Sequence, residues 1–497
     1  MNKHLNILII LPVLALFLLC SPARAQYVLD WAMPYGGDGQ DEANTCIETR
    51  DGDLMIGGFA KQKEHQLWIV KTRKDGKPRW GKIFPGYFAS SCNSMIQDRD
   101  SNIVFTGYAI KKGAFQKDLL VMKIDTLGNV LWHKTYGGIL DEEGTKIVEC
   151  GPEGGYAVCG YSCTNNDGMP NWYMMRIDTH GNKVWDKEFG MSADDRALSI
   201  ANTHDGGFVI TGYLGNANGN AQKIMWIIKL DQDGNDIWVR EFEHNMWTCG
   251  TAIMETSDSM IVAAGYTRAY TITDYDVLTV KCTADGDTVW TRTFGNEDWQ
   301  EATDIVETFD GSYVVGGFNM SNSKDQSSFL MLKYDRRGDL IWHNSFKRRS
   351  QDYAKSIAET HDHGILLAGT TFSLGKGWDM AVLKMKNVEN TELFFAFPTD
   401  SLATSLIDQL TFRMCLKSFG TPREIKVLVN DKIQMVDTEF RKPTGTEQTG
   451  GCDYPLEYTV QLIPGKNVIK LEIRDYKLFL HEKELTVYRI PPYDFVR

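Results

Sequence analysis

The 497-residue sequence lacks the basic excess that proteins need to bind nucleic acids or anionic membranes. Lysine and arginine total 53 against 65 aspartates and glutamates, so the formal net charge is −12. Neutralising phosphate groups requires a basic face, and we therefore predict no nucleic-acid partner. Beyond residue 25 no apolar run reaches the length of a membrane-spanning helix, so we expect no transmembrane segment in the mature chain.

The sequence also lacks the short motifs of several enzyme classes. It contains neither the G-x-S-x-G motif of serine hydrolases nor the H-E-x-x-H motif of zinc proteases. Its ten cysteines follow no regular spacing, and Cys159 with Cys163 is the only close pair, which does not match a zinc site. We therefore predict no catalytic residue, no metal site and no cofactor.

Residues 1–25 have the features of a secretory signal peptide. A basic start is followed by an apolar stretch over residues 5–19 and by Ala-Arg-Ala at residues 23–25. This pattern is typical of cleavage before Gln26. A lipoprotein anchor at Cys20 is the alternative, although Leu19 is larger than the residue a lipidation motif usually has there. We expect an exported protein, located in the periplasm, at the cell surface or in the medium.

Export places the cysteines in an oxidising compartment, where disulfides can persist. Nine cysteines follow residue 25, so at least one is unpaired. We interpret most of them as buried thiols. Cys415 and Cys452 are the only two in the C-terminal segment and form the predicted disulfide.

An internal repeat determines the predicted fold. Tryptophan recurs at spacings of 49 to 53 residues, with an aromatic residue four positions later each time. The repeated tryptophans are Trp31, Trp80, Trp132, Trp185, Trp238, Trp290 and Trp342. A glycine column accompanies them at Gly58, Gly107, Gly160, Gly212, Gly265, Gly317 and Gly369. Seven copies in register indicate seven equivalent structural units.

Each unit contains four short runs that alternate like β-strands, with tight-turn signals such as Asp310-Gly311 between them. The glycines suggest close approach of a neighbouring backbone. Repeated four-stranded units predict an all-β fold, a seven-bladed β-propeller over residues 26–390. The seventh copy lacks its last strand, and residues 27–31 can supply it. We predict that this segment pairs with residues 379–385 and closes the ring, because closure removes exposed sheet edges.

The repeat resembles that of secreted β-propeller proteins from Bacteroidota-type bacteria. The shared features are Trp-x-x-x-Tyr-Gly-Gly from Trp132, Asp-Gly-Gly-aromatic from Asp205, and Lys-Leu-Asp-x-x-Gly-x-x-x-Trp from Lys229. The resemblance covers about residues 27–386. It implies the propeller fold and export, and it implies no particular activity.

The last hundred residues form a different module. The tryptophan and glycine columns end near residue 391, while short alternating apolar runs continue. Six or seven strands over this length predict a β-sandwich, an immunoglobulin-like domain over residues 391–497. Such modules commonly act as spacers or docking domains.

Three sets of side chains are candidates for binding a ligand or a metal. Asp41, Asp141 and Asp194 precede the inner strands of three copies, where paired carboxylates could act on a glycoside. Because similar acids recur in many copies, a structural role as acceptors of backbone N–H bonds is the stronger interpretation. His361-Asp362-His363 could bind a metal, but His361 aligns with His204 at a hairpin turn, which favours a turn residue.

In the fifth and sixth copies Trp247 and Trp299 occupy the same region, and two tryptophans on one rim could stack against sugar rings. Plugging the rim, or packing on the C-terminal module, is the alternative. Long polar segments at 162–171, 214–222 and 319–327 should project from that same face.

The leading hypothesis is a non-enzymatic exported scaffold that binds a glycan or an envelope protein. A polysaccharide-active enzyme of the glycoside hydrolase type, or a quinoprotein-like propeller enzyme, is the alternative. The Asp-x-x-Gly-x-x-x-Trp segment is similar to the docking repeat of quinoproteins, but blade docking explains it without a cofactor. An enzyme would need acids or cofactor ligands that converge on the propeller axis.

Overall fold

The computed structural model is all-β. It describes residues 27–387 apart from short gaps at 38, 62, 152–153, 164–167, 191–192, 216–222, 243–245, 270–273, 322–325, 347–350, 373 and 375–376, together with strands between 393 and 489. The described residues contain no helix long and apolar enough to cross a membrane. Residues 1–25, which we predict to be a signal peptide, lie outside the described residues.

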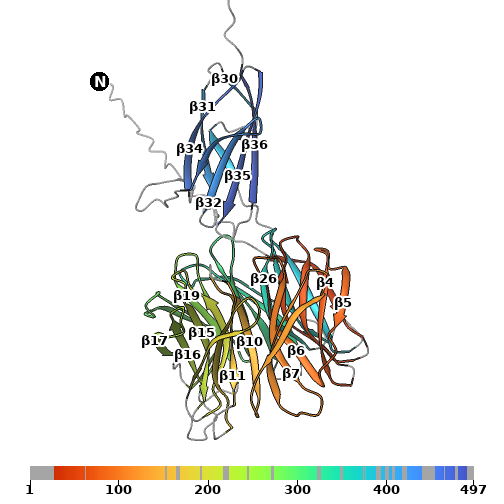
Figure 1. The fold of residues 1–497 in the computed structure, drawn as a ribbon. Helices are drawn as coiled ribbons and strands as arrows, with labels where there is room; N and C mark the ends of the chain where they lie inside the picture. Colours follow the sequence, from red (N-terminus) through yellow and green to blue (C-terminus); the bar gives the residue numbers. More distant parts are fainter. Residues whose placement is uncertain are drawn as a thin grey trace, which may run out of the picture.

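Seven four-stranded antiparallel sheets, the blades, make up the first part of the chain (Figure 1). From the inner to the outer strand, blade 1 is β2 (Asp41–Glu48), β3 (Leu54–Lys61), β4 (His65–Thr72) and β5 (Pro78–Ile83). Blade 2 is β6 (Ala89–Gln97), β7 (Ile103–Ile110), β8 (Lys117–Ile124) and β9 (Val130–Tyr136). Blade 3 is β10 (Glu142–Glu149), β11 (Tyr156–Ser162), β12 (Asn171–Ile177) and β13 (Lys183–Phe189). Blade 4 is β14 (Arg196–Asn202), β15 (Phe208–Gly215), β16 (Lys223–Leu230) and β17 (Asp236–Phe242).

The remaining blades repeat this pattern. Blade 5 is β18 (Met246–Glu255), β19 (Ile261–Ala269), β20 (Asp276–Cys282) and β21 (Thr288–Phe294). Blade 6 is β22 (Trp299–Glu307), β23 (Tyr313–Ser321), β24 (Gln326–Tyr334) and β25 (Leu340–Phe346). Blade 7 is β26 (Asp352–Glu359), β27 (Ile365–Thr371), β28 (Asp379–Asn387) and β1 (Tyr27–Tyr35). Burial decreases outward, because the inner three strands are largely covered while outer strands such as β5 alternate between exposed and half-buried residues.

The blades form a closed ring. Each inner strand contacts the inner strands of both neighbouring blades, and β2 of blade 1 contacts β26 of blade 7 as well as β6 of blade 2. A ring of four-stranded blades that close on themselves is the architecture of a β-propeller, as the repeat predicted.

The strand from the N-terminus completes blade 7, as predicted. Tyr27 pairs with Asn387 and Tyr35 pairs with Met380 in an antiparallel ladder. Two further hydrogen bonds join blade 7 to blade 1, from the Asp41 N–H to the Trp378 carbonyl at 2.6 Å and from the His361 N–H to the Glu48 carboxylate at 2.6 Å. The first and last parts of the propeller segment are therefore held together at both ends of the blade.

The glycine column lets the second strand of each blade approach the inner strand closely. A Cβ placed on Gly317 would overlap the carbonyl oxygen of Glu301, and the same clash with an inner-strand carbonyl occurs at all seven positions. Each inner strand has a bulge opposite this glycine, for example between Ala302 and Asp304. The predicted close approach of the two backbones is confirmed: at the glycine, the bulged inner strand lies directly against the second strand.

The tryptophan column joins neighbouring blades. Trp132 of blade 2 donates its indole N–H to the Thr179 carbonyl of blade 3 at 3.1 Å, and its ring lies against Gly181. The aromatic residue four positions later acts in the same way, because the Tyr136 hydroxyl donates to the Gly181 carbonyl. Gly181 has a φ of 75°, so the tight turn that receives the ring favours glycine. Blade docking is thus a sufficient reason for this repeat.

A buried lysine anchors the inner hairpin of most blades. In blade 6 the Lys333 ammonium is fully buried and lies 2.7 Å from the Asp310 carboxylate, which also accepts the Thr308 hydroxyl. Burial by itself favours the neutral carboxyl, but Lys333 and these hydrogen bonds hold the pKa of Asp310 below its usual value. The equivalent lysines are Lys71, Lys123, Lys229, Lys281 and Lys384.

We expect Lys333→Met to lower the free energy of unfolding by about 3–5 kcal/mol at pH 7, because it leaves a buried carboxylate without its partner. The lowered pKa of Asp310 means that the pair stabilises the fold above the carboxyl's usual pKa of 3.8. This stabilisation is lost as the pH falls through the lower native value. The deficit of the variant should therefore shrink between pH 7 and pH 3, measured by urea unfolding. Lys183→Met, in the exposed Lys183–Asp186 pair, is the control and should unfold like the parent.

The C-terminal strands form two further sheets, and none of them pairs with a blade. The three-stranded sheet contains β29 (Leu393–Phe397), β31 (Gln409–Leu416) and β34 (Tyr454–Gln461). The five-stranded sheet contains β30 (Leu402–Ser405), β32 (Pro422–Val429), β33 (Lys432–Asp437), β35 (Gly465–Asp475) and β36 (Leu480–Arg489). The immunoglobulin-like assignment stays a prediction, and the boundary predicted at 390/391 falls in residues outside the described set.

Seven cysteines of the propeller are free and buried, as predicted for most of them. Burial raises the pKa of the Cys159 thiol to about 11 and that of the Cys46 thiol to about 12, so both are inert at neutral pH. Cys452 lies outside the described residues, so the predicted bond between Cys415 and Cys452 stays a prediction.

Candidate functional site

The two ends of the blades differ in character. We call the end where each inner strand begins the loop face, because it also carries the connections between second and third strands. The opposite end carries the inner hairpins and the tight turns between third and fourth strands, and we call it the hairpin face. Trp247 and Trp299 lie at the beginning of β18 and β22, so both are on the loop face. Both side chains are half-buried.

Four side chains form a continuous stack across blades 5 and 6. The Arg268 guanidinium lies 5.4 Å from the Trp247 ring centroid and 5.4 Å from the Tyr275 ring centroid. Tyr275 in turn stacks on Trp299, with centroids 4.4 Å apart and planes at 30°. The structure therefore brings the two predicted tryptophans into one array, through Arg268 and Tyr275, which the sequence analysis did not identify. Arginine between aromatic rings is a favourable cation–π arrangement.

The edge of the stack is fixed by a half-buried acid. The Trp299 indole N–H donates to the Glu301 carboxylate at 2.7 Å. Burial raises the pKa of Glu301, and this hydrogen bond and nearby lysines only partly oppose the effect. The bond fixes the orientation of the Trp299 ring.

Asp41 does not belong to an exposed ligand surface, which corrects the prediction for this residue. Its side chain is 4 % exposed, and its carboxylate accepts the N–H groups of Gly37 at 3.0 Å and Lys61 at 3.1 Å. Strand register also places Gln40, and not Asp41, at the position of Trp247 and Trp299. Counting residues agrees with this register, because Gln40 follows Tyr35 by five residues, just as Trp247 follows Phe242 and Trp299 follows Phe294. Accepting backbone N–H groups is the structural role that we favoured for this acidic column.

Asp141 and Asp194 lie at the same level as the tryptophans, on blades 3 and 4. The Asp141 carboxylate accepts the Lys117 N–H at 2.9 Å. Asp194 pairs with Arg196 at 2.7 Å and accepts the Tyr213 hydroxyl at 3.3 Å. The two acids belong to polar networks of the loop face, and the structure does not bring them into contact with the stack.

The propeller axis carries an ion pair between distant blades. Lys146 of blade 3 lies 3.4 Å from Asp304 of blade 6, and because these blades are not neighbours the pair spans the centre. Asp304 also accepts the Ser356 hydroxyl and the Ile357 N–H, each at 3.1 Å. A glycoside hydrolase needs a second carboxyl about 5–10 Å away and free to act. Asp304 is instead committed to a lysine and to the neighbouring blade.

The His361 region is a hairpin turn, as predicted. His361 contacts the Glu48 carboxylate at 2.9 Å, and His204 makes the equivalent contact with Glu255 at 2.9 Å. Within the described residues no cluster of histidine, cysteine and acidic side chains could hold a metal ion.

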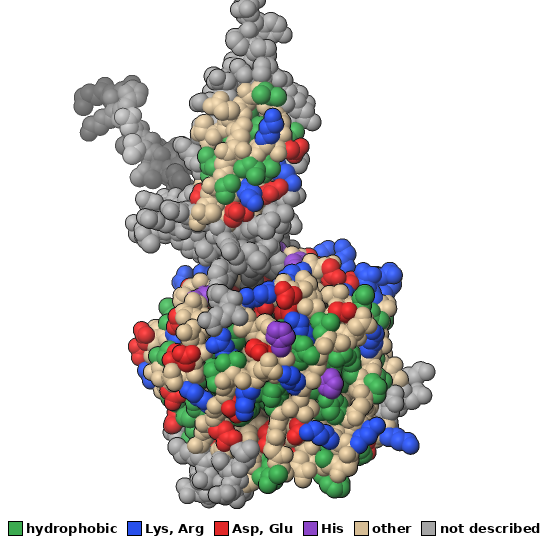
Figure 2. Space-filling view, viewed as in Figure 1, with side chains coloured by type: hydrophobic (Ala, Val, Ile, Leu, Met, Phe, Trp, Pro, Cys, Tyr) green, Lys and Arg blue, Asp and Glu red, His purple; other side chains and the backbone are tan. Residues whose placement is uncertain are grey.

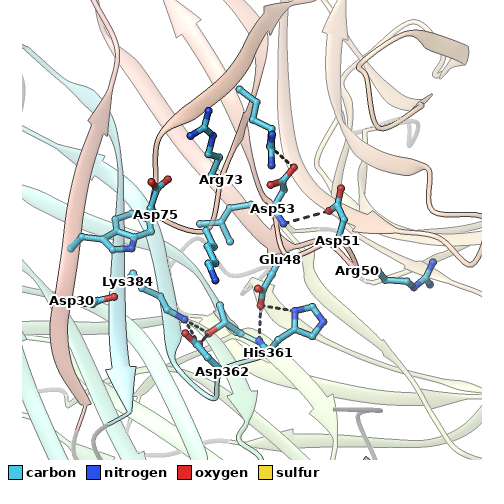
Figure 3. Close-up of a pocket in the computed structure, with 16 residues that line it drawn as sticks. Asp30, Glu48, Arg50, Asp51, Asp53, Arg73, Asp75, His361, Asp362 and Lys384 are labelled. Carbon is cyan, nitrogen blue, oxygen red and sulfur yellow. Dashed lines mark hydrogen bonds and ion pairs between the residues drawn. The ribbon is translucent and has the colours of Figure 1, made fainter. Parts of the chain in front are cut away.

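A pocket of about 910 Å³ lies on the hairpin face where blade 7 meets blade 1 (Figure 3). We call it the seam pocket, and the sequence analysis missed it. Blade 7 contributes the end of β28, the inner hairpin and β1, and blade 1 contributes its inner hairpin and its outer turn. Its charged lining residues are Asp30, Glu48, Arg50, Asp51, Asp53, Arg73, Lys74, Asp75, Arg79, His361, Asp362 and Lys384. A comparison of the charged residues at equivalent positions of the seven copies could have revealed the seam pocket.

The sequence matches no protein-family model and no curated protein. Among solved structures it is similar to the extracellular domain of a candidate hybrid two-component system from B. thetaiotaomicron, at 12 % identity and a TM-score of 0.41 over 91 % of this chain. The chain spans 56 % of that protein's length. A protein of unknown function from Dyadobacter fermentans matches at 10 % identity and a TM-score of 0.45, over 73 % of this chain and all of that one. Sqt1 from Chaetomium thermophilum matches at 9 % identity and a TM-score of 0.41 over the same shares.

Proposed function

We propose that the chain is an exported, non-enzymatic binding protein whose loop face holds a glycan. The observation that carries the proposal is the stack of Trp247, Arg268, Tyr275 and Trp299 across two blades. Aromatic faces bind the apolar faces of sugar rings, and a cation between them adds a donor for hydroxyl groups. The half-buried rings keep contact with solvent while their neighbours hold their orientation.

Two further features support binding rather than catalysis. The acid on the axis, Asp304, is neutralised by Lys146 and bound to blade 7. The loop face also carries connections of varied length on a rigid scaffold, which is the usual arrangement in binding proteins. An envelope protein as partner is the alternative occupant of the same face. Export rests on the signal-peptide pattern of residues 1–25.

We expect the Trp247→Ala/Trp299→Ala double variant to lose glycan binding by about tenfold or more, since two stacking contacts of about 1–1.5 kcal/mol each are removed. A glycan array should identify the ligand for the parent protein, and isothermal titration should measure its affinity. Phe115→Ala is the matched control, because Phe115 is an exposed aromatic on the loop face of blade 2, outside the stack.

The half-buried tryptophans require a folding check. Thermal unfolding should show that the double variant retains a cooperative transition. Arg268→Met, which keeps the hydrophobic stem of the side chain, should weaken binding without unfolding the rim. Unchanged affinity in both the double variant and Arg268→Met would eliminate the stack as the binding site. Retention of an envelope protein without any glycan signal would favour the protein partner.

A further inference from the structure

The seam pocket contains charged residues at positions where the other blades have aliphatic ones. Each outer strand has a one-residue bulge just before its tryptophan. In blades 2 to 6 the bulged residue is aliphatic: Leu131, Val184, Ile237, Val289 and Ile341. In blade 7 it is Asp30 and in blade 1 it is Arg79, and both line the pocket. The two blades that form the seam are thus the two that carry a charge at this position.

The outer turn of blade 1 departs from the repeat in the same place. In blade 2 the turn begins with Asp125, whose carboxylate accepts the N–H groups of Leu127 and Asn129. Asp178, Asp231 and Asp335 do the same in their blades. Blade 1 has Arg73 at this position, followed by Lys74. The Arg73 side chain takes no part in closing its turn and lines the pocket instead (Figure 3). Lys74 also lines the pocket.

Most charges in the pocket are already neutralised. Asp53 pairs with Arg79 at 2.7 Å and with Lys71 at 3.2 Å. Lys384 pairs with Asp362, and Lys71 also pairs with Asp51. Glu48 contacts His361, which carries a charge only when it is protonated.

Three basic side chains in the pocket have no carboxylate partner among the described residues. Arg73 and Lys74 form no ion pair or side-chain hydrogen bond there, and Arg50 donates to the Asp98 and Arg99 carbonyls and to the Ser101 hydroxyl. Asp30 is the acid in the pocket that likewise has no cationic partner in the described part of the chain. The protein as a whole has a net charge of −12, and Figure 2 shows acidic and basic side chains interspersed over its visible face. The pocket lining as a whole has six acidic side chains and five lysines and arginines, so its unpaired positive charge is confined to Arg73 and Lys74 at the outer turn, beside Asp75.

We propose that the seam pocket binds an acidic oligosaccharide, a hydroxyl-rich chain that bears carboxylate or sulfate groups. Arg73 and Lys74 bind the anionic group through charge-assisted hydrogen bonds. Asp30, on the facing strand β1, accepts hydroxyl groups, and the indole of Trp31 lines the wall beside it. A volume of about 910 Å³ holds several sugar rings and far exceeds the size of a single inorganic anion. This site is on the opposite face from the Trp247–Trp299 stack and does not depend on it.

The test is isothermal titration at low ionic strength with four probes: an oligogalacturonate, a sulfated tetrasaccharide, a neutral cello-oligosaccharide and inorganic sulfate. We expect one or both of the acidic saccharides to bind the parent protein and the neutral one not to bind at this site. Arg73→Gln/Lys74→Gln should weaken that binding by about tenfold or more. Lys112→Gln/Arg337→Gln removes two exposed cations elsewhere, Arg337 from the equivalent turn of blade 6, and should change the affinity by no more than about twofold.

Asp30→Leu, which installs the type of residue found in the other blades, separates a saccharide from a simple anion. Loss of the hydroxyl acceptor should weaken saccharide binding, whereas loss of a negative charge should strengthen the binding of sulfate. The proposal is overturned if neither acidic saccharide binds, if both double variants lose affinity equally, or if Asp30→Leu strengthens the binding of every anionic probe. Trp247→Ala/Trp299→Ala should leave this titration unchanged, so failure of one site is distinguishable from failure of the other.

Discussion

A chain that begins at Gly36, and so lacks β1, should lose roughly 10 °C or more of its thermal unfolding midpoint or unfold without a cooperative transition. β1 supplies the outer strand of blade 7, and without it the largely buried strand β28 becomes the edge of its sheet, whereas every other blade ends in a fourth strand. Two core clusters also depend on this strand, one through Tyr27 and one through Tyr35, which are 1 % and 7 % exposed.

The control is a chain that begins at Tyr27, which keeps the whole strand and should unfold like the mature protein. Light scattering should show association of the shortened chain, because an unpaired strand edge invites pairing with another copy. Equal midpoints and equal solubility for the two chains would show that the ring does not depend on the N-terminal strand. They would also remove the physical basis for the seam between blades 7 and 1.

Gly317→Ala should lower the free energy of unfolding by about 3 kcal/mol, although it adds a single methyl group. The added Cβ would overlap the Glu301 carbonyl oxygen of the inner strand. Backbone cannot move aside as a flexible side chain can, so β22 must shift away from β23. Because β22 contacts the inner strands on either side, the shift is transmitted to blades 5 and 7.

The neighbouring residue provides the matched control. A Cβ on Gly316 would lie 3.2 Å from Cβ and 3.3 Å from Cδ1 of Ile357, and its three nearest atoms all belong to that side chain. Gly316→Ala should therefore cost about 1 kcal/mol or less. Urea unfolding of both variants measures the difference. Equal losses would mean that general crowding, and not the close approach of the two backbones, sets the requirement for glycine.

The repeat was readable from the sequence because each of its columns has a local physical cause. A tryptophan such as Trp132 must meet a glycine turn in the next blade, and Gly317 must admit a backbone carbonyl, so neither position tolerates other residues. The same logic predicted the pairing of residues 27–31 with β28, since the seventh copy has one strand fewer than the others. Turn residues such as His361 were identified for the same reason.

The candidate sites were harder to predict because they depend on residues that the repeat does not constrain. The sequence indicated Trp247 and Trp299, but Arg268 and Tyr275, which join them, come from a different strand and a connection. Asp41 was placed one position out of register, and the structure shows that it is buried. Arg268 and Tyr275 flank a connection whose length varies between blades, so counting residues does not place them in space. For the acidic column, counting from Tyr35 would have placed Gln40 at the position of Trp247 and Trp299.

The sequence by itself determined the all-β class, the sevenfold repeat and the closing strand, because strand alternation and blade docking are local requirements that every copy of the repeat must meet. Only the tertiary structure decided where the residues that depart from the repeat lie and which residues they contact. Asp30 and Arg73 are separated by more than forty residues and belong to different blades, yet ring closure places both in one pocket. Closure also pairs Lys146 with Asp304 across the axis. Contacts of this kind arise from the ring as a whole, and no single copy of the repeat contains them.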